Sequence, residues 1–477
     1  MCFDLTKKEK LQFRAVDLVL GQILKYIDKQ PEKNLLKLVG AAEKLAGNLF
    51  PAKNFDAFRK AIHDPENIWT GYVLSILRDM DRSALRKGIM AMGYGTYVGT
   101  KTVRANREKY KCNFPYILLF DPTSACNRKC KGCWSAEYGS KYSLTLEEMQ
   151  SIVNQGTELG SHLYMMTGGE PLIRKKDILT LCEAHPDCMF LCYTNATLID
   201  EDFCREMNRV GNLSLALSIE GSEESNDFRR GEGSYATTMR AMDLLKKHRC
   251  FFGMSVCYTS ANIDMVTSDA FIDQMIEKGV KFGLYFNYMP IGANAVPELI
   301  PSPAQREHMY KWLRRMRNSK SGKPMFVMDF QNDAEYVGGC IAGGRNYFHI
   351  NSAGDIEPCV FIHYSDANIR THTLLEALHS PLFQAFFHNQ PFNDNHLRPC
   401  PMLENPQYLR KMVDETGAKS TDFLSPESAD TLCSRCDKFA NAWAPEAERI
   451  WNSSKHPKTK TFYYRDTPEG KAQEKSS

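Results

Sequence analysis

The sequence is poor in features that mark membrane, secreted and nucleic-acid-binding proteins. No run reaches the ~18 consecutive apolar residues of a membrane-spanning helix, and MCFDLTKKEK lacks the apolar stretch and cleavage site of a signal peptide. Neither sign of charge is in large excess, because the formal net charge is only +3 over 477 residues. No nucleic-acid partner is therefore expected. With 43% hydrophobic residues, the sequence predicts a cytoplasmic, globular protein of two or three domains.

A disulfide scaffold is not expected either, although the chain has 16 cysteines, because the cytoplasm keeps thiols reduced. Cysteines that cluster in such a chain favour metal ligation or redox chemistry, and they cluster in segments 126–133 and 340–436. Six others fall in or beside predicted strands and helices and are interpreted as core thiols: Cys182, Cys188, Cys192, Cys204, Cys250 and Cys257.

Residues 1–112 form a basic region with helical periodicity, containing 21 lysine and arginine residues against 12 aspartate and glutamate residues. Segments 7–27 and 32–50 repeat apolar residues at i, i+3, i+4 and i+7, which indicates amphipathic helices. Segment 88–99 is apolar, glycine-rich and flanked by basic residues. It is interpreted as a loop that packs on the next domain, and peripheral contact with an anionic membrane surface or a phosphate stays an alternative.

Strand and helix patterns alternate from residue 113 to residue 335, which predicts βα units and a parallel sheet. The first helix has the best-defined start, because Thr145 and Glu148 fit a capping box. Six units indicate an α/β fold of the partial (β/α)6 barrel type, with functional residues where strands end and loops begin. The expected strands lie in 115–123, 162–169, 189–195, 213–221, 251–260 and 281–290.

The remaining chain has shorter elements. Residues 336–450 are punctuated by cysteines and predict a small cysteine-rich α+β extension, whereas residues 451–477 are polar and predict a tail.

Cys126, Cys130 and Cys133 have the spacing CxxxCxxC directly after the first expected strand. A loop that leaves a strand can wrap three thiolates around one metal centre, and a four-iron cluster then keeps one iron without a protein ligand. Structural zinc normally takes four protein ligands, so three thiols fit a closed zinc site poorly. The spacing therefore favours an iron-sulfur cluster with an open iron.

This motif resembles the signature of the radical S-adenosylmethionine (SAM) superfamily. Thr167-Gly-Gly-Glu-Pro171 is similar to the family's GGEP segment, Ser218-Ile-Glu220 to its ribose-contacting strand end, and Asp227-Phe-Arg-Arg-Gly231 to its Asp-x-x-Arg-Gly loop. The resemblance implies a [4Fe-4S] cluster and cleavage of SAM to a 5′-deoxyadenosyl radical, which removes a hydrogen atom from a substrate. It would place around SAM the residues Gly168, Gly169, Glu170, Asn195, Ser218, Glu220 and Arg230.

Within that set, Glu170 would accept hydrogen bonds from the ammonium group of SAM, and Arg230 would pair with its carboxylate. The chain departs from the family at Gly132, where many members have an aromatic residue before the third cysteine. Trp134 follows that cysteine and is a candidate replacement, although a core aromatic is the alternative. No residue is assigned as a catalytic acid, base or nucleophile.

Cys340 is followed by thirteen residues, Gly354, four more residues and Cys359, in CIAGGRNYFHINSAGDIEPC. This spacing resembles the opening of the SPASM and twitch extensions of radical SAM enzymes. The resemblance implies one auxiliary [4Fe-4S] cluster, held by four of the five cysteines in this region. Cys340, Cys359, Cys433 and Cys436 are the preferred set, with Cys400 as the fifth candidate. A structural zinc site is the alternative, because paired CxxC thiols also suit zinc.

The resemblance thus implies a radical SAM enzyme supplied with electrons by a donor such as flavodoxin or ferredoxin. Its substrate is either a peptide or protein, as for maturases with this extension, or a membrane lipid acyl chain, which the basic N-terminal region would suit. A different class is a non-catalytic iron-sulfur electron carrier or a zinc-stabilised binding protein. The GGEP and Ser-x-Glu strand ends argue against that class, because a carrier has no need to bind an aminoacyl nucleotide.

Overall fold

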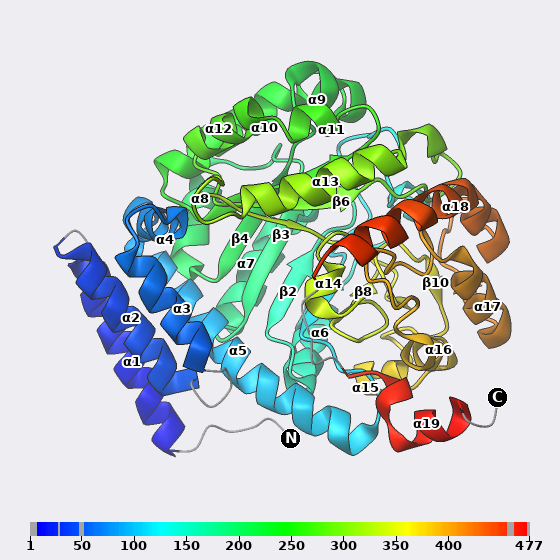
Figure 1. Ribbon diagram of the computed structural model, residues 1–477, viewed down its shortest axis with the longest axis horizontal. Coiled ribbons are helices and arrows are strands. Elements are labelled where there is room, and N and C mark those ends of the chain that lie inside the picture. Colours follow the sequence, from blue (N-terminus) through cyan, green and yellow to red (C-terminus); the bar gives the residue numbers. More distant parts are fainter. Residues whose placement is uncertain (1–6, 27–28, 47–51, 456–461, 475–477) are drawn as a thin grey trace.

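The computed structural model of the chain describes residues 7–26, 29–46, 52–455 and 462–474. A parallel sheet with surrounding helices forms the centre of the molecule, the N-terminal helices cover one side of it, and the C-terminal extension lies against its other end (Figure 1). In the described part of the chain, no helix combines the length and the apolar content needed to cross a membrane.

The main sheet has nine strands in the order β7-β6-β5-β4-β3-β2-β1-β8-β9. Neighbouring strands are parallel throughout, except that β9 is antiparallel to β8. Their bounds are β1 (Ile117–Phe120), β2 (Leu163–Met166), β3 (Met189–Thr194), β4 (Leu213–Ser218), β5 (Phe252–Tyr258), β6 (Phe282–Asn287), β7 (Phe326–Asp329), β8 (Tyr347–Ile350) and β9 (Ile356–Glu357).

The predicted α/β fold with six βα units is confirmed, and the sheet continues beyond it at both edges. β7 pairs with β6, and β8 from the C-terminal extension pairs with the free edge of β1 in the register Ile117↔Tyr347. The extension is therefore joined to the barrel by the backbone hydrogen bonds between β8 and β1.

Helices cover the outside of this sheet. The capping box at the start of α6 is present, with the Thr145 side chain accepting from the Glu148 backbone N–H and Glu148 accepting from the Thr145 backbone N–H. The helices of this region are α6 (Leu146–Leu159), α7 (Lys175–Ala184), α8 (Glu201–Val210), α9 (Glu223–Arg230), α10 (Ser234–Lys247), α11 (Ile263–Val266), α12 (Asp269–Glu277), α13 (Pro303–Met316) and α14 (Ala334–Val337), and the short 3-10 helices are η1 (Ala136–Tyr138), η2 (Pro171–Arg174) and η3 (Pro297–Leu299).

Side chains of the strands alternate between the two faces of the sheet. On β6, Leu284 and Phe286 face the barrel interior, where they join a small apolar cluster with residues of β2, β3 and β4. Tyr285, between them, belongs to the core under the helices, and its ring lies 5.0 Å from that of Trp312 on α13. The helix layer is thus tightly packed, whereas the interior face can line a chamber.

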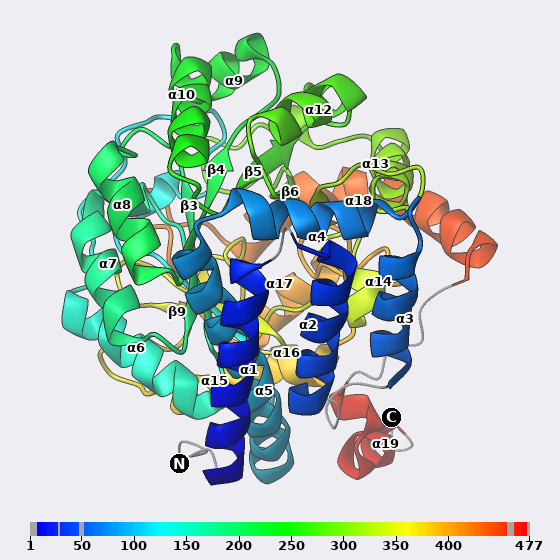
Figure 2. The same ribbon diagram turned by 90° about the vertical axis from the view of Figure 1, so that its left-hand side faces the viewer.

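The N-terminal region is helical, as predicted, with α1 (Lys7–Lys25), α2 (Pro31–Ala46), α3 (Ala52–His63), α4 (Ile68–Asp79) and α5 (Arg82–Tyr110). Figure 2 shows α1, α2 and α3 side by side, with α4 across one end of them. The predicted ends of the first two helices, 27 and 47–50, lie outside the described residues.

The expectation of a loop at 88–99 is wrong, because these residues lie within α5. Glycine at two positions lets this helix approach the barrel closely. A Cβ at Gly95 would lie 2.5 Å from Cβ of His162, and one at Gly99 would lie 2.5 Å from the carbonyl oxygen of Gly160.

Short elements and one long helix make up the C-terminal extension. They are β10 (Tyr364–Ser365), α15 (Leu374–Leu378), α16 (Pro381–Asn389), α17 (Pro406–Thr416), β11 (Lys419–Ser420) and α18 (Ala429–Ser453). The segment predicted as a polar tail contains the end of α18, η4 (Tyr464–Asp466) and α19 (Pro468–Glu474).

Candidate active site

The CxxxCxxC loop begins where β1 ends, and the turn after β2 holds its first residues in place. The backbone N–H of Gly169 donates to the carbonyl of Thr123 at 3.0 Å, and that of Glu170 donates to the carbonyl of Ala125 at 2.8 Å. A Cβ at Gly169 would overlap Ala125, so the glycine predicted to bring the backbone close to SAM is also required for this contact.

The three thiols of this loop lie close enough to interact electrostatically. Burial raises the pKa of Cys126, and the Cys133 and Cys130 thiols add to the increase. Burial also raises the pKa of Cys130, while the Arg230 guanidinium opposes it. Thiolates that repel one another are stabilised when they bind a positively charged centre. This donor set therefore suits an iron-sulfur cluster with three protein ligands.

The predicted residues Glu170 and Asn195 connect the second and third strand ends to this loop. Glu170 is 1% exposed, and its carboxylate accepts from the hydroxyl of Thr194 at 2.7 Å and from the backbone N–H of Leu172 and Asn195 at 3.0 and 2.8 Å. The Asn195 amide in turn donates to Sγ of Cys126 at 3.9 Å. Glu170 therefore fixes the strand ends, and its contact with the SAM ammonium group stays a prediction.

Glu220 follows the fourth strand and holds two arginines at the site. Its Oε1 accepts from Nη1 of Arg229 at 2.5 Å and from Nε of Arg230 at 2.7 Å, while its buried Oε2 has no hydrogen-bond partner. Arg229 was not among the predicted site residues, although it stands in the same Asp-x-x-Arg-Gly loop. Both guanidinium groups reach the chamber described next.

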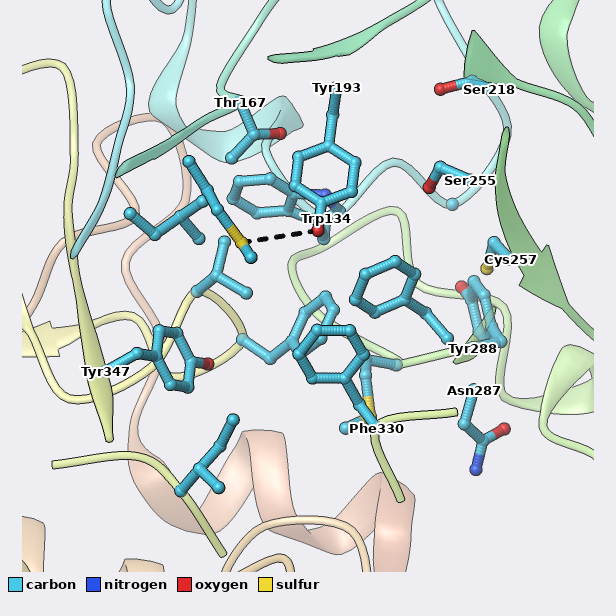
Figure 3. Close-up of a pocket in the computed structure, with 18 of the residues that line it drawn as sticks. Trp134, Thr167, Tyr193, Ser218, Ser255, Cys257, Asn287, Tyr288, Phe330 and Tyr347 are labelled. Atoms are coloured by element: carbon cyan, nitrogen blue, oxygen red, sulfur yellow. Dashed lines mark hydrogen bonds between the residues drawn. The ribbon is translucent and has the colours of Figure 1, made fainter. Parts of the chain in front are cut away.

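A chamber with a cavity volume of about 160 Å³ opens on the interior face of the barrel (Figure 3). The predicted residues Ser218 and Arg230 lie on its wall with Arg229. Most of the remaining wall is apolar or aromatic and comes from the strands and from the C-terminal extension: Leu119, Trp134, Met165, Tyr193, Phe286, Phe330, Tyr347, Val360 and Phe361. The arrangement can hold a polar cofactor at one end and an apolar group in the middle.

Gly132 also borders this chamber, and Tyr288 occupies the adjacent space. A Cβ at Gly132 would lie 2.5 Å from the Tyr288 phenol oxygen, and Gly132 has φ +61°. Many family members carry an aromatic residue at the position of Gly132. In this chain the space beside that position is filled by Tyr288, which follows β6. Trp134 instead packs edge-on against His349 and Phe361, with ring centroids 6.0 and 6.2 Å away.

Cys257 was interpreted as a core thiol, but it lines the chamber next to Ser255 on the inward face of β5 (Figure 3). Burial raises the pKa of Cys257 to about 11, although Arg229 opposes the shift. The alternation of strand residues could have revealed this position, because Ser255 and Cys257 share one face of β5.

A buried polar network links the first cysteine loop to the extension. Tyr138 in η1 donates to Glu357 on β9, and His349 on β8 lies between Glu357 at 2.6 Å and Asp121 at 3.0 Å. Burial lowers the pKa of His349, but the Asp121 and Glu357 carboxylates outweigh this and raise it to about 10. His349 is therefore a cation at neutral pH, and it joins the end of β1 to the extension.

The five cysteines of the extension border one apolar cluster. Cys340, Cys359 and Cys400 are partly exposed, like Cys130 and Cys133, whereas Cys433 and Cys436 are buried on α18. Which of the five bind a cluster stays a prediction at this point.

Comparisons with known proteins agree with this geometry. Residues 120–273 match the radical SAM superfamily model, and residues 340–402 match the SPASM model, an iron-sulfur cluster-binding domain. An AdoMet-dependent heme synthase of Methanosarcina barkeri is 22% identical over 68% of this chain and 89% of its own length. The mycofactocin maturase MftC of Mycobacterium ulcerans is 24% identical over 52% of this chain and 69% of its own.

Among solved structures, Streptococcus suis SuiB bound to its precursor peptide SuiA has the same fold. Its TM-score is 0.53 at 18% identity, covering 72% of this chain and 81% of that one. The chain is a radical SAM enzyme with a C-terminal SPASM domain. Its cofactors are accordingly SAM and [4Fe-4S] clusters.

Proposed function

We propose that this enzyme cleaves SAM reductively at the loop of Cys126, Cys130 and Cys133, and removes a hydrogen atom from an apolar side chain of a peptide or protein. The observation that carries the proposal is the chamber, because Arg230 and Ser218 stand on the same continuous wall as the aromatic residues of the barrel and the extension. A cofactor bound near the arginines would therefore face whatever enters the apolar part.

The bound cluster and SAM supply a one-electron cleavage that yields a 5′-deoxyadenosyl radical. The chain's own residues prepare the site for SAM. Glu220 holds Arg229 and Arg230 side by side at the wall, where the Arg230 guanidinium would pair with the SAM carboxylate. Ser218 offers a hydroxyl to the polar part of SAM, and the apolar wall excludes water that would divert a reactive intermediate.

A peptide substrate is supported by two similar proteins, a mycofactocin maturase and SuiB, whose structure holds a precursor peptide. A lipid acyl chain would also suit the apolar wall. The basic residues that favoured a lipid make contacts within the protein, however: Arg86 pairs with Asp17, and Lys87 donates to the carbonyl of Arg209. The peptide is therefore the proposal, and the lipid is one outcome of the test.

The test uses the reconstituted enzyme with SAM and dithionite, and measures 5′-deoxyadenosine with and without cell fractions. A small-peptide fraction should raise its yield several-fold, and protease treatment of that fraction should remove the effect. Filling the chamber with Val360→Trp should remove the stimulation too, while the matched exposed variant Val337→Trp should keep it. Stimulation by a protease-treated lipid extract, with none by peptides, would contradict the peptide proposal.

A further inference from the structure

A histidine, an aspartate and a cysteine meet at the amino ends of β2 and β3, at the opposite end of the sheet from the CxxxCxxC loop. His162 directly precedes β2, and Asp187 and Cys188 directly precede β3. Leu163 pairs with Met189 in the parallel register, and the backbone N–H of Met189 donates to the carbonyl of His162 at 2.9 Å. The backbone of two paired strands therefore brings these three residues together.

The side-chain atoms of these residues form a triangle. Nδ1 of His162 lies 3.8 Å from Oδ2 of Asp187 and 3.9 Å from Sγ of Cys188, and Sγ lies 3.9 Å from Oδ1 of Asp187. The nitrogen–oxygen distance exceeds the ~2.7–3.2 Å of a hydrogen bond. Donor atoms that share one zinc ion, at about 2.0–2.3 Å each, lie roughly 3–4 Å apart. The triangle therefore has the size of a metal site.

The imidazole ring of His162 is buried without a strong hydrogen bond. The residue is 5% exposed, and within the described ranges of the chain its Nε2 has no hydrogen-bond partner. Its Nδ1 is aimed into the triangle, at the long distances given above. Buried polar groups in native proteins are nearly always paired, so a ring in this state calls for a partner. A cation bound by Nδ1 would provide one.

Helix α5 of the N-terminal region fixes the position of this ring. A Cβ at Gly95 would lie 2.5 Å from Cβ of His162, and one at Gly99 would lie 3.5 Å from its Cδ2. The ring of Tyr94 packs edge-on against the imidazole, with the centroids 5.6 Å apart. A ligand that is already held in place loses little conformational freedom when it binds an ion.

Asp187 gives the triangle one side that faces solvent. Its side chain is 43% exposed, whereas His162 and Cys188 are buried. The backbone of Cys188 is fixed, because its N–H donates to the carbonyl of His185 at 3.1 Å and its carbonyl accepts from the amide of Asn212 at 3.0 Å. An ion can therefore reach the two buried donors past the carboxylate, and a water molecule can occupy its fourth position.

We infer that Nδ1 of His162, a carboxylate oxygen of Asp187 and Sγ of Cys188 bind a zinc ion, with water as its fourth ligand. A nitrogen, an oxygen and a sulfur donor together suit zinc. The ion ties the amino ends of β2 and β3 to the ring on which α5 packs, and Cys188 is then a ligand and not an inert core thiol. This site is separate from the cysteine loops, so the inference goes beyond the proposed function and does not depend on SAM cleavage.

The experiment uses the untagged full chain with its iron-sulfur clusters reconstituted, dialysed anaerobically against micromolar zinc. Elemental mass spectrometry should find about one zinc ion per chain. Cys188→Ala and Asp187→Asn should each weaken zinc binding by about tenfold or more. Cys182→Ala, which removes another buried thiol, is the matched control and should bind zinc as the unmodified chain does. Asp187 is partly exposed, so its variant should keep the fold, which circular dichroism checks.

X-ray absorption at the zinc edge identifies the ligands of the bound ion. It should show one sulfur at about 2.3 Å and nitrogen or oxygen atoms at about 2.0–2.2 Å, whereas zinc trapped in a cluster site would be surrounded by sulfur. Zinc should also slow hydrogen exchange in α5 and β2 of the unmodified chain, but not in Asp187→Asn. A chain that binds no zinc, a shell of sulfur alone, or zinc binding unchanged in both variants would overturn the inference.

Discussion

The Tyr288 ring fills the space that any side chain at position 132 would need, so this tyrosine position requires glycine at 132. A Cβ there would lie 2.5 Å from the phenol oxygen and 2.9 Å from Cε2. The phenol oxygen is held by the backbone N–H of Val296 at 2.9 Å, so the ring cannot turn away without losing that bond. The departure of this chain from its family at position 132 thus has a structural cause at the end of β6.

Gly132→Ala should destabilise the protein more than a glycine replacement that only strains the backbone. Gly132 has φ +61°, where a non-glycine residue costs about 1–2 kcal/mol, and the clash with Tyr288 adds to this cost. Gly417→Ala is the matched control, because Gly417 has φ +67° and open space around its Cα. Urea unfolding of the cluster-free chain measures both. Equal losses would show that the tyrosine contact is unimportant.

Glu220→Gln should weaken SAM binding and destabilise the fold. Glu220 is fully buried and accepts from Arg229 and Arg230, so loss of its charge leaves two nearly buried guanidinium groups without their counter-ion. Breaking a buried pair in this way costs about 3–5 kcal/mol.

Isothermal titration of SAM and thermal unfolding measure the two effects. The control is Asp243→Asn, which removes an exposed partner of Lys278 and should cost at most about 1 kcal/mol. Unchanged SAM affinity in Glu220→Gln would mean that Arg229 and Arg230 do not contact SAM.

The contribution of His349 to stability should fall as pH rises. The pKa of His349 is about 10 in the folded chain, because the Asp121 and Glu357 carboxylates outweigh the effect of burial, against 6.5 for an ordinary histidine. A raised pKa stabilises the fold fully below pH 6.5, and this stabilisation is lost as pH approaches 10. The groups that face the ring are Asp121, Glu357, Trp134, Tyr138 and His363.

The measurement is the free energy of unfolding of the cluster-free chain and of His349→Gln between pH 6 and about 10. The difference between them should shrink across this range, by up to about 5 kcal/mol. His372→Gln, at an exposed position, should show no such trend. A difference for His349→Gln that stays constant with pH would contradict a charged His349.

The barrel fold could be predicted from the sequence because the patterns that indicate it lie within short segments. The alternation of apolar strands with capped helices fixes the βα units, and motifs at strand ends mark one edge of a parallel sheet. The pairing of β8 with β1 was not predictable, because it joins Ile117 to Tyr347 across more than two hundred residues. The helical state of 88–99 was missed because its glycines allow close contact with His162 and Gly160 on the barrel. The local sequence gives no sign of that contact.

The motifs located some of the residues that the structure brings together, and only the fold locates others. Ser218, Glu220 and Arg230 meet at one place as the motifs implied. Cys257, Tyr288 and Arg229 reach the same chamber without a motif assigning them to it.

The most direct test of the proposed activity is SAM cleavage by the reconstituted enzyme under anaerobic conditions with dithionite. We expect 5′-deoxyadenosine to form, and we expect Cys126→Ala, Cys130→Ala and Cys133→Ala together to abolish it while iron remains in the extension. An intact cluster in the first loop that yields no 5′-deoxyadenosine and leaves SAM uncleaved would contradict it.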